Sequence, residues 1–107
     1  MEWSWIAALY MLFAQRAPSP IVELNRAVAV AMAFGPDAGL ELVDALVADG
    51  ALASYHLLPA VRGELLAKLG RGDEARVEFQ RAAELTRNER ERDVLLARMS
   101  SLPRKRR

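Results

Sequence analysis

Apolar residues recur every three or four positions along most of this chain, which is the spacing of one buried face of an α-helix. No stretch alternates apolar and polar residues in the way a half-exposed β-strand does. Proline and glycine pairs divide the apolar runs and mark turns. The pattern therefore predicts about six helices, over residues 3–16, 21–34, 36–48, 54–69 and 73–86, and a last one between Asn88 and Pro103.

Prolines near the helix boundaries refine these limits. Pro36 is expected in the first turn of the third helix, where the missing backbone donor costs nothing. Pro59 lies inside the fourth range, so it should either kink that helix or delay its regular part to about Leu58. Pro103 is expected to end the last helix.

The last predicted helix has a start signal of its own. Asn88 is a favourable cap residue, and Glu91 three positions later completes a capping-box-like pattern. We expect this helix to bury Val94, Leu95 and Met99.

A shift of the chain by 36 positions reveals an internal correspondence. It aligns Ala27 with Gly63, Val30 with Leu66, Gly39 with Ala75, Val43 with Phe79, and Leu46 with Ala82, so that small residues meet small ones at two positions. The period is close to the ~34 residues of the tetratricopeptide repeat. The predicted fold is all-α, with antiparallel helical hairpins stacked as a tetratricopeptide-like array. The second hairpin fits that pattern better than the first, in which Leu46 stands where a small residue is usual.

Composition agrees with one soluble domain over residues 1–103, followed by a basic disordered tail over residues 104–107. Hydrophobic residues make up 52% and charged residues 27% of the 107 positions. The apolar segment 3–14 lacks a basic leader and is too short to span a bilayer, so it is expected to be a core helix rather than a signal peptide. The chain has no cysteine, which fits a cytoplasmic location.

Charge is unevenly distributed along the chain. Residues 1–60 contain two basic and six acidic residues, a net charge of −4, whereas residues 61–107 contain thirteen basic and eight acidic residues, a net charge of +5. The basic residues alternate with acids such as Glu84 and Glu89, and no aromatic platform accompanies them. We therefore do not expect specific nucleic-acid recognition by this chain. Ion pairs of Glu74 and Glu78 with Arg81 are the simpler expectation.

Residues that carry chemistry are few. His56 is the single histidine, and no serine, cysteine or carboxylate stands at a spacing that indicates a catalytic relay. With no cysteine, a zinc site is not expected. The turn at residues 70–72 follows a helix and lacks the lysine and hydroxyl of a phosphate-binding loop. The sequence predicts no catalysis, no metal and no cofactor.

The tetratricopeptide pattern implies a peptide-binding groove along the first helix of each pair. The expected groove is mainly apolar and includes Leu24, Asn25, Val28, Met32, Leu57, Ala60, Glu64 and Lys68. Four further residues are either polar anchors for a partner or structural residues: Arg26, Tyr55, His56 and Arg62. The structural alternatives pair Arg26 with Glu23 and Arg62 with Glu64.

Three segments of the sequence show a more specific resemblance: APSPIVELNRAVAVAMAFGPDAGLELVDAL, YHLLPAVRGELLAKLGR and FQRAAELTRNERER. Together they resemble the C-terminal, tetratricopeptide-like extension of extracytoplasmic-function RNA polymerase sigma factors. The resemblance covers about residues 3–99 and implies that the chain is part of a longer bacterial transcription initiation factor. The domains that bind core polymerase and read the promoter have no counterpart here.

The resemblance implies a regulatory role through protein contacts. The expected partner is the factor's own sigma domains, RNA polymerase or a separate regulator, with DNA contacted only through the missing N-terminal domains and no membrane contact. The alternatives are a free-standing repeat adaptor for an unrelated peptide and a scaffold that self-associates through an exposed first helix. A small-molecule-binding domain would require a closed apolar pocket containing His56 and Tyr55.

Overall fold

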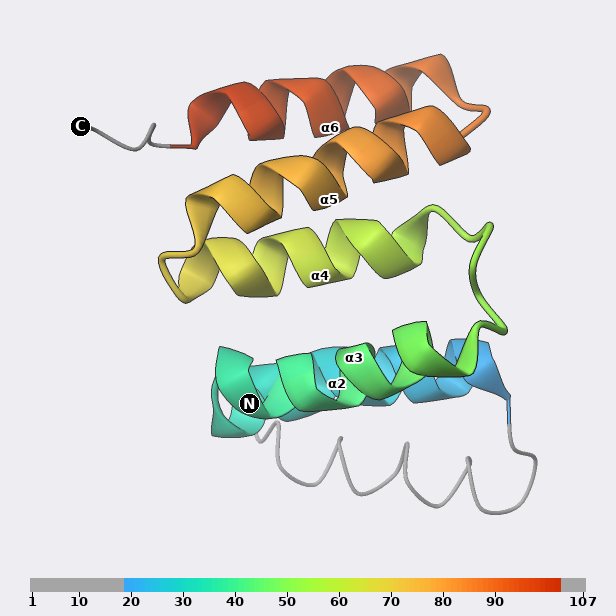
Figure 1. Ribbon diagram of the computed structural model, residues 1–107, viewed down its shortest axis with the longest axis vertical. Helices are drawn as coiled ribbons and strands as arrows, with labels where there is room; N and C mark the ends of the chain where they lie inside the picture. Colours follow the sequence, from blue (N-terminus) through green and yellow to red (C-terminus); the bar gives the residue numbers. More distant parts are fainter. Residues whose placement is uncertain (1–18, 103–107) are drawn as a thin grey trace. The chain divides into compact units, whose positions relative to one another are not determined.

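The computed structural model describes residues 19–102, which form an all-helical structure without strands in that range (Figure 1). The predicted all-α hairpin fold is confirmed. Five helices follow one another along this part of the chain: α2 (Pro20–Phe34), α3 (Pro36–Asp49), α4 (Leu57–Lys68), α5 (Gly72–Leu85) and α6 (Glu89–Ser101). The helix predicted over residues 3–16 lies outside the described residues, as does the tail predicted over residues 104–107.

The chain divides into two compact units, residues 1–53 and 54–107. In the first unit, α2 and α3 form a hairpin joined by Gly35 alone, which caps the end of one helix and the start of the next. Its φ of 112° is unfavourable for any side chain with a Cβ, so glycine is required at this turn. Pro36 begins α3, as predicted.

The two helices of the first hairpin approach most closely at Gly39 of α3. A Cβ at this position would lie 2.5 Å from the Ala31 Cβ and 2.8 Å from the Ala27 carbonyl oxygen. Ala27 and Val43 are fully buried beside this contact. Small residues thus bring the backbones of α2 and α3 together.

In the second unit, α5 packs against both α4 and α6 (Figure 1). The close approach here lies at Gly63 of α4, where a Cβ would lie 3.1 Å from two ring atoms of Phe79 on α5. Phe79 is 1% exposed, and Leu66, Ala75 and Ala82 are completely buried around it. The small and large positions aligned by the 36-residue shift are therefore core positions in this hairpin.

The helix α4 has a start set by Pro59 and ends in a glycine-dependent motif. It begins at Leu57, which confirms the alternative that Pro59 delays its regular part to about Leu58; Pro59 lies within the first helical turn, and the residues before Leu57 form turns. At the other end, the Gly70 amide donates to the Ala67 carbonyl and the Arg71 amide to the Leu66 carbonyl. This is the Schellman arrangement, with Gly70 at a φ of 77°.

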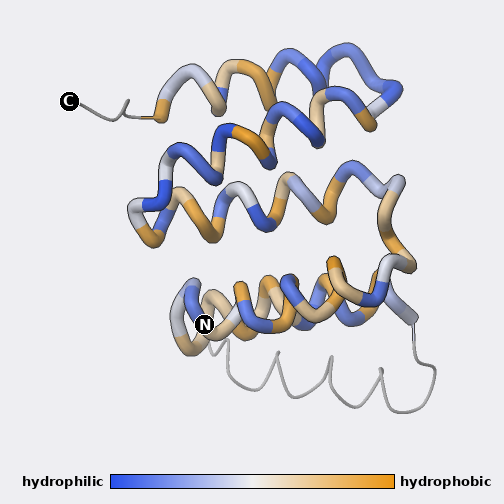
Figure 2. Tube along the Cα trace, in the orientation of Figure 1, coloured by the Kyte–Doolittle hydropathy of each residue, from blue (hydrophilic) through white to orange (hydrophobic). Residues whose placement is uncertain are grey.

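The helix α6 is less buried than the sequence predicts. Val94, expected in the core, is 67% exposed, and α6 contains no buried residue. Leu95 and Met99 are half-buried. The prediction for Val94 was wrong because α6 packs on α5 through a narrow stripe, which leaves the neighbouring apolar position open. Figure 2 shows the hydrophilic first turns of α6 followed by an apolar middle. Among residues 19–102, no helix is both long and apolar enough to cross a bilayer.

Candidate binding pocket

A pocket of ≈ 250 Å³ lies within the second unit, between the first turns of α4 and those of α6. Its walls are largely apolar, and it is lined by His56, Leu57, Ala60, Arg90, Glu91, Val94 and Leu95. Leu57 and Val94, one from each helix, are 40% and 67% exposed. The pocket therefore presents apolar side chains that are partly open to solvent.

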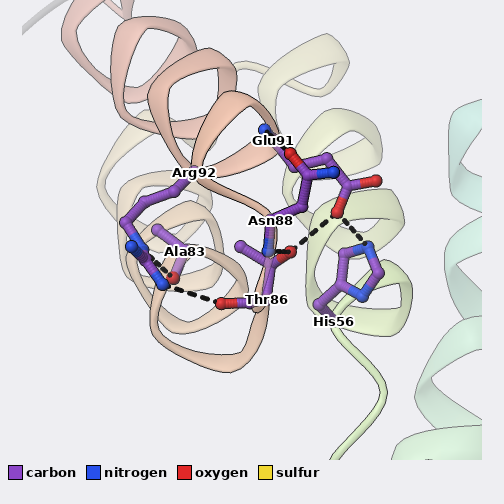
Figure 3. Close-up of polar contacts among 6 residues, drawn as sticks. All are labelled: His56, Ala83, Thr86, Asn88, Glu91 and Arg92. Atoms are coloured by element: carbon purple, nitrogen blue, oxygen red, sulfur yellow. Dashed lines mark hydrogen bonds and ion pairs between the residues drawn. The ribbon is translucent and has the colours of Figure 1, made fainter.

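The start of α6 is fixed by a network of hydrogen bonds from the α5–α6 turn (Figure 3). The Asn88 side chain accepts a hydrogen bond of 3.0 Å from the Glu91 amide, as predicted for the cap. The Asn88 amide donates to the Thr86 hydroxyl oxygen at 3.2 Å, and that hydroxyl donates to Glu91 Oε1 at 2.7 Å. Thr86 therefore takes the second bond of the expected capping box, which leaves the Glu91 carboxylate directed elsewhere.

The Glu91 carboxylate also approaches the start of α4. Its Oε1 lies 3.0 Å from His56 Nε2, an ion-pair distance when the imidazole is protonated. The Nε2 atom is buried and makes no aligned hydrogen bond, so this contact is one of proximity rather than of a directed bond. The His56 ring also meets Tyr55 edge to face, with centroids 5.7 Å apart. His56 thus lies where the start of α4 meets the start of α6.

Arg92 secures the same turn from the other side. Its Nε donates to the Ala83 carbonyl at 3.2 Å and its Nη2 to the Thr86 carbonyl at 2.9 Å. These bonds satisfy carbonyl groups at the end of α5 that have no partner within the helix. The pocket is consequently built on a turn whose polar groups are largely paired with one another.

A second link joins α4 to α6 farther along both helices. Arg98 donates two hydrogen bonds to the Glu64 carboxylate, at 2.9 and 3.1 Å, and its guanidinium lies 5.6 Å from the centre of the Phe79 ring. Glu64 and Arg98 are 34 residues apart, one tetratricopeptide period. Residues one period apart lie on corresponding helices of successive repeat units. The opposite charges of Glu64 and Arg98 at this spacing are therefore the signal in the sequence that could have predicted the pair.

The predicted groove residues fall in both units. In α4, Leu57 and Ala60 line the pocket, Glu64 pairs with Arg98, and Lys68 is exposed near the helix end. In α2, Leu24 is a core residue at 3% exposure, whereas Met32 is 56% exposed. The remaining two groove residues of that helix are an exposed Asn25 and a half-buried Val28.

The polar candidates mostly make contacts within the chain. Arg26 donates to Glu23 at 3.0 Å, which confirms the predicted pair. Arg62 lies 3.4 Å from Glu78, whose residue is only 7% exposed, rather than pairing with Glu64. The expected ion pairs of Glu74 and Glu78 with Arg81 give way to pairs with Arg71 and Arg62. Sequence spacing along one helix misses the Arg62–Glu78 pair, because it joins α4 to α5.

Sequence reasoning also missed the pocket residues on α6. Arg90, Val94 and Leu95 lie on the helix that the sequence assigns to the core, so nothing in their spacing indicated a shared surface with α4. The small-molecule alternative is only partly matched, because the pocket contains His56 but Tyr55 is not among its lining residues.

Comparison with known proteins adds one relative. The chain is 44% identical over 87 residues to an uncharacterised protein of Rhizobium meliloti. The matched segment makes up 81% of this chain and 20% of that protein, so the chain spans about a fifth of the relative's length. No family model and no solved structure matches the chain.

Proposed function

We propose that this chain is a regulatory, protein-binding domain of a bacterial extracytoplasmic-function RNA polymerase sigma factor. It would modulate transcription initiation by docking on the factor's own sigma domains, on RNA polymerase or on a partner protein. The proposal assigns no catalysis to the chain and places it in the cytoplasm. Its starting point is the resemblance of the three sequence segments to the C-terminal extension of such factors.

The observation that carries the proposal is the apolar pocket between α4 and α6. Two of its wall residues, Leu57 and Ala60, belong to the groove predicted from the repeat pattern. Exposed apolar side chains that gather around a hollow are typical of protein-binding surfaces. An enzyme would instead require convergent reactive groups, and Thr86 here is 3% exposed with its hydroxyl bonded to Glu91.

Two further observations support a repeat-like interaction domain. The Gly63–Phe79 contact brings a small residue of one helix against a large residue of the next, as the tetratricopeptide pattern requires. The relative from Rhizobium meliloti is about five times as long as the segment it shares with this chain, which leaves room for further domains in that protein. A role as one module of a longer factor agrees with this proportion.

A binding experiment tests the proposal directly. The chain would be immobilised and presented with the sigma domains of the corresponding full-length factor, and separately with core RNA polymerase, at low and high salt. Docking through apolar contacts predicts binding to one of them that persists at high salt, because screening weakens only the charged contacts. Absence of binding to both would contradict the sigma-factor role and favour the free-standing adaptor. Sedimentation of the chain alone would reveal the alternative of self-association.

A further inference from the structure

We propose that the pocket between α4 and α6 takes a single large apolar side chain of a peptide segment that carries an aspartate or glutamate next to that side chain. This inference rests on the proposed protein-binding function and specifies the chemistry of the partner. It assigns the apolar anchor to Leu57, Ala60, Val94 and Leu95, and the carboxylate to Arg90.

The size of the pocket sets the size of the anchor. An apolar cavity of about 150 Å³ holds a benzene molecule. The volume of ≈ 250 Å³ is therefore sufficient for a phenylalanine, leucine or tryptophan side chain. It lies below the range of about 300–1,000 Å³ typical of sites for whole small-molecule ligands. One side chain of a larger partner is the occupant that fits.

The charged residues around the pocket indicate which charge the partner carries next to its apolar side chain. Glu91 is engaged by the Thr86 hydroxyl and lies within ion-pair distance of His56. Within residues 19–102, Arg90 makes no ion pair, although it lines the pocket. A carboxylate on the partner would give this guanidinium an opposite charge that no described residue supplies, whereas the half-exposed Glu91 carboxylate already has the Thr86 hydroxyl as a partner.

The pocket walls are positioned before any partner arrives. The Asn88 cap and the two Arg92 hydrogen bonds fix the first turn of α6, and the contact of His56 with Glu91 brings the first turn of α4 against it. A preformed site binds with a smaller loss of conformational freedom than a surface that must order on contact. The bound segment can therefore be short, with its affinity concentrated in one anchor.

A selection from a library of random dodecapeptides displayed on phage tests the partner chemistry without assuming a sequence. The immobilised target is the full chain, and the counter-target is its Val94→Asp variant. We expect enriched peptides to share an aromatic residue or leucine with aspartate or glutamate within one helical turn. Enrichment of basic peptides, enrichment that is equal on the counter-target, or no enrichment would each overturn the inference.

Matched variants then locate the binding. Val94→Asp places a charge in the pocket wall and should weaken the best peptide at least about tenfold, the loss expected for one buried apolar contact. Val77→Asp is the control, since Val77 on α5 is similarly exposed, at 60%, and does not line the pocket. Both sites are open to solvent, so both variants should fold. Circular dichroism of each variant checks this expectation.

A charge reversal tests the role of Arg90. Arg90→Glu should lower the affinity for the acidic peptide about threefold to fivefold, as expected for the loss of an exposed ion pair. It should raise the affinity for a variant peptide in which lysine replaces the acidic residue. Arg87→Glu makes the same charge change at an exposed position outside the pocket and should leave both affinities nearly unchanged. An equal effect of the two reversals would show that only the overall charge matters and would refute the assignment to Arg90.

The two proposals fail separately. If the chain binds sigma domains or polymerase and Val94→Asp leaves that binding intact, the protein-binding function stands while the pocket inference falls. If acidic apolar peptides bind at the pocket but neither transcription partner is retained, the pocket inference stands and the sigma-factor role falls.

Discussion

The contact between Gly63 and Phe79 predicts that Gly63→Ala lowers the stability of the natural chain but raises it when Phe79 is replaced by a smaller residue. Gly63 lies in the middle of α4, where alanine is favoured over glycine by about 1 kcal/mol. An added Cβ would, however, lie 3.1 to 3.2 Å from three atoms of the Phe79 ring, closer than the 3.5–4.0 Å optimum for carbon atoms. Helix propensity and crowding therefore act in opposite directions at this position.

The structure indicates that crowding prevails. Phe79 is 1% exposed and surrounded by buried side chains, so its ring has little room to retreat. Overpacking of this kind costs about 2 kcal/mol. Subtracting the propensity gain leaves Gly63→Ala less stable than the natural chain by about 1 kcal/mol.

The ring can be removed to isolate the crowding. Leucine has no atoms beyond its δ carbons, so a Phe79→Leu background removes the contacts with Cε1 and Cζ and leaves only a methyl group near the Cδ1 position; Gly63→Ala should then raise the free energy of unfolding by about 1 kcal/mol. The two substitutions would be coupled by about 2 kcal/mol, within the range found for residues in contact. Phe79→Leu alone should cost about 1 kcal/mol, as a substitution that nearly conserves volume.

Urea unfolding of the four chains, followed by far-ultraviolet circular dichroism, measures this coupling. The slopes of the unfolding free energy against urea should agree among the four, so that the midpoints report stability. Since Gly63 and Phe79 belong to the same compact unit, they should affect the same transition. A stabilising Gly63→Ala in the natural background, or the same effect in both backgrounds, would refute the argument.

Two further substitutions probe the first hairpin and the α6 cap. Gly39→Ala should lower the free energy of unfolding by about 3 kcal/mol, more than Gly63→Ala does. Its Cβ would lie 2.5 Å from the Ala31 Cβ and 2.8 Å from the Ala27 carbonyl oxygen, and neither atom can move aside alone. A smaller loss in urea unfolding would show that the two helices can separate. Asn88→Ala should lower the free energy of unfolding by about 1 kcal/mol and the Tm by about 4 °C or more, because the capping hydrogen bond is lost. Asn88→Asp should retain the cap. Equal melting temperatures for these two variants would show that the side-chain cap does not stabilise α6.

The sequence predicted those parts of the fold that depend on local chemistry. The turn at Gly35 and the cap at Asn88 follow from the residue types themselves, because a positive φ and the capping hydrogen bond are each favoured by few residue types. The burial of Val94 depends instead on how wide a stripe of α6 meets α5, which periodicity does not specify.

The candidate site was predicted only in part for the same reason. Leu57 and Ala60 could be assigned to a groove from the repeat pattern, since they lie on the first helix of a pair. Arg90 and Glu91 enter the pocket through the geometry of the α5–α6 turn, where Thr86 rather than Glu91 binds the Asn88 amide. A capping motif in the sequence indicates where a helix begins. It does not indicate whether the carboxylate of the motif bonds the cap amide or contacts a neighbouring helix.

The single-residue turn at Gly35 has a consequence for how this hairpin can vary among related chains. Because one residue ends α2 and begins α3, the turn has no slack to absorb a change of length. An extra residue within the first turn of α3 would rotate the rest of that helix by about 100° about its axis. Gly39 would then leave the narrow contact with Ala31, and a bulkier residue would take its place. Insertions in this hairpin are therefore tolerable only in lengths that restore the helical phase, whereas the longer connection between α3 and α4 is free of that restriction.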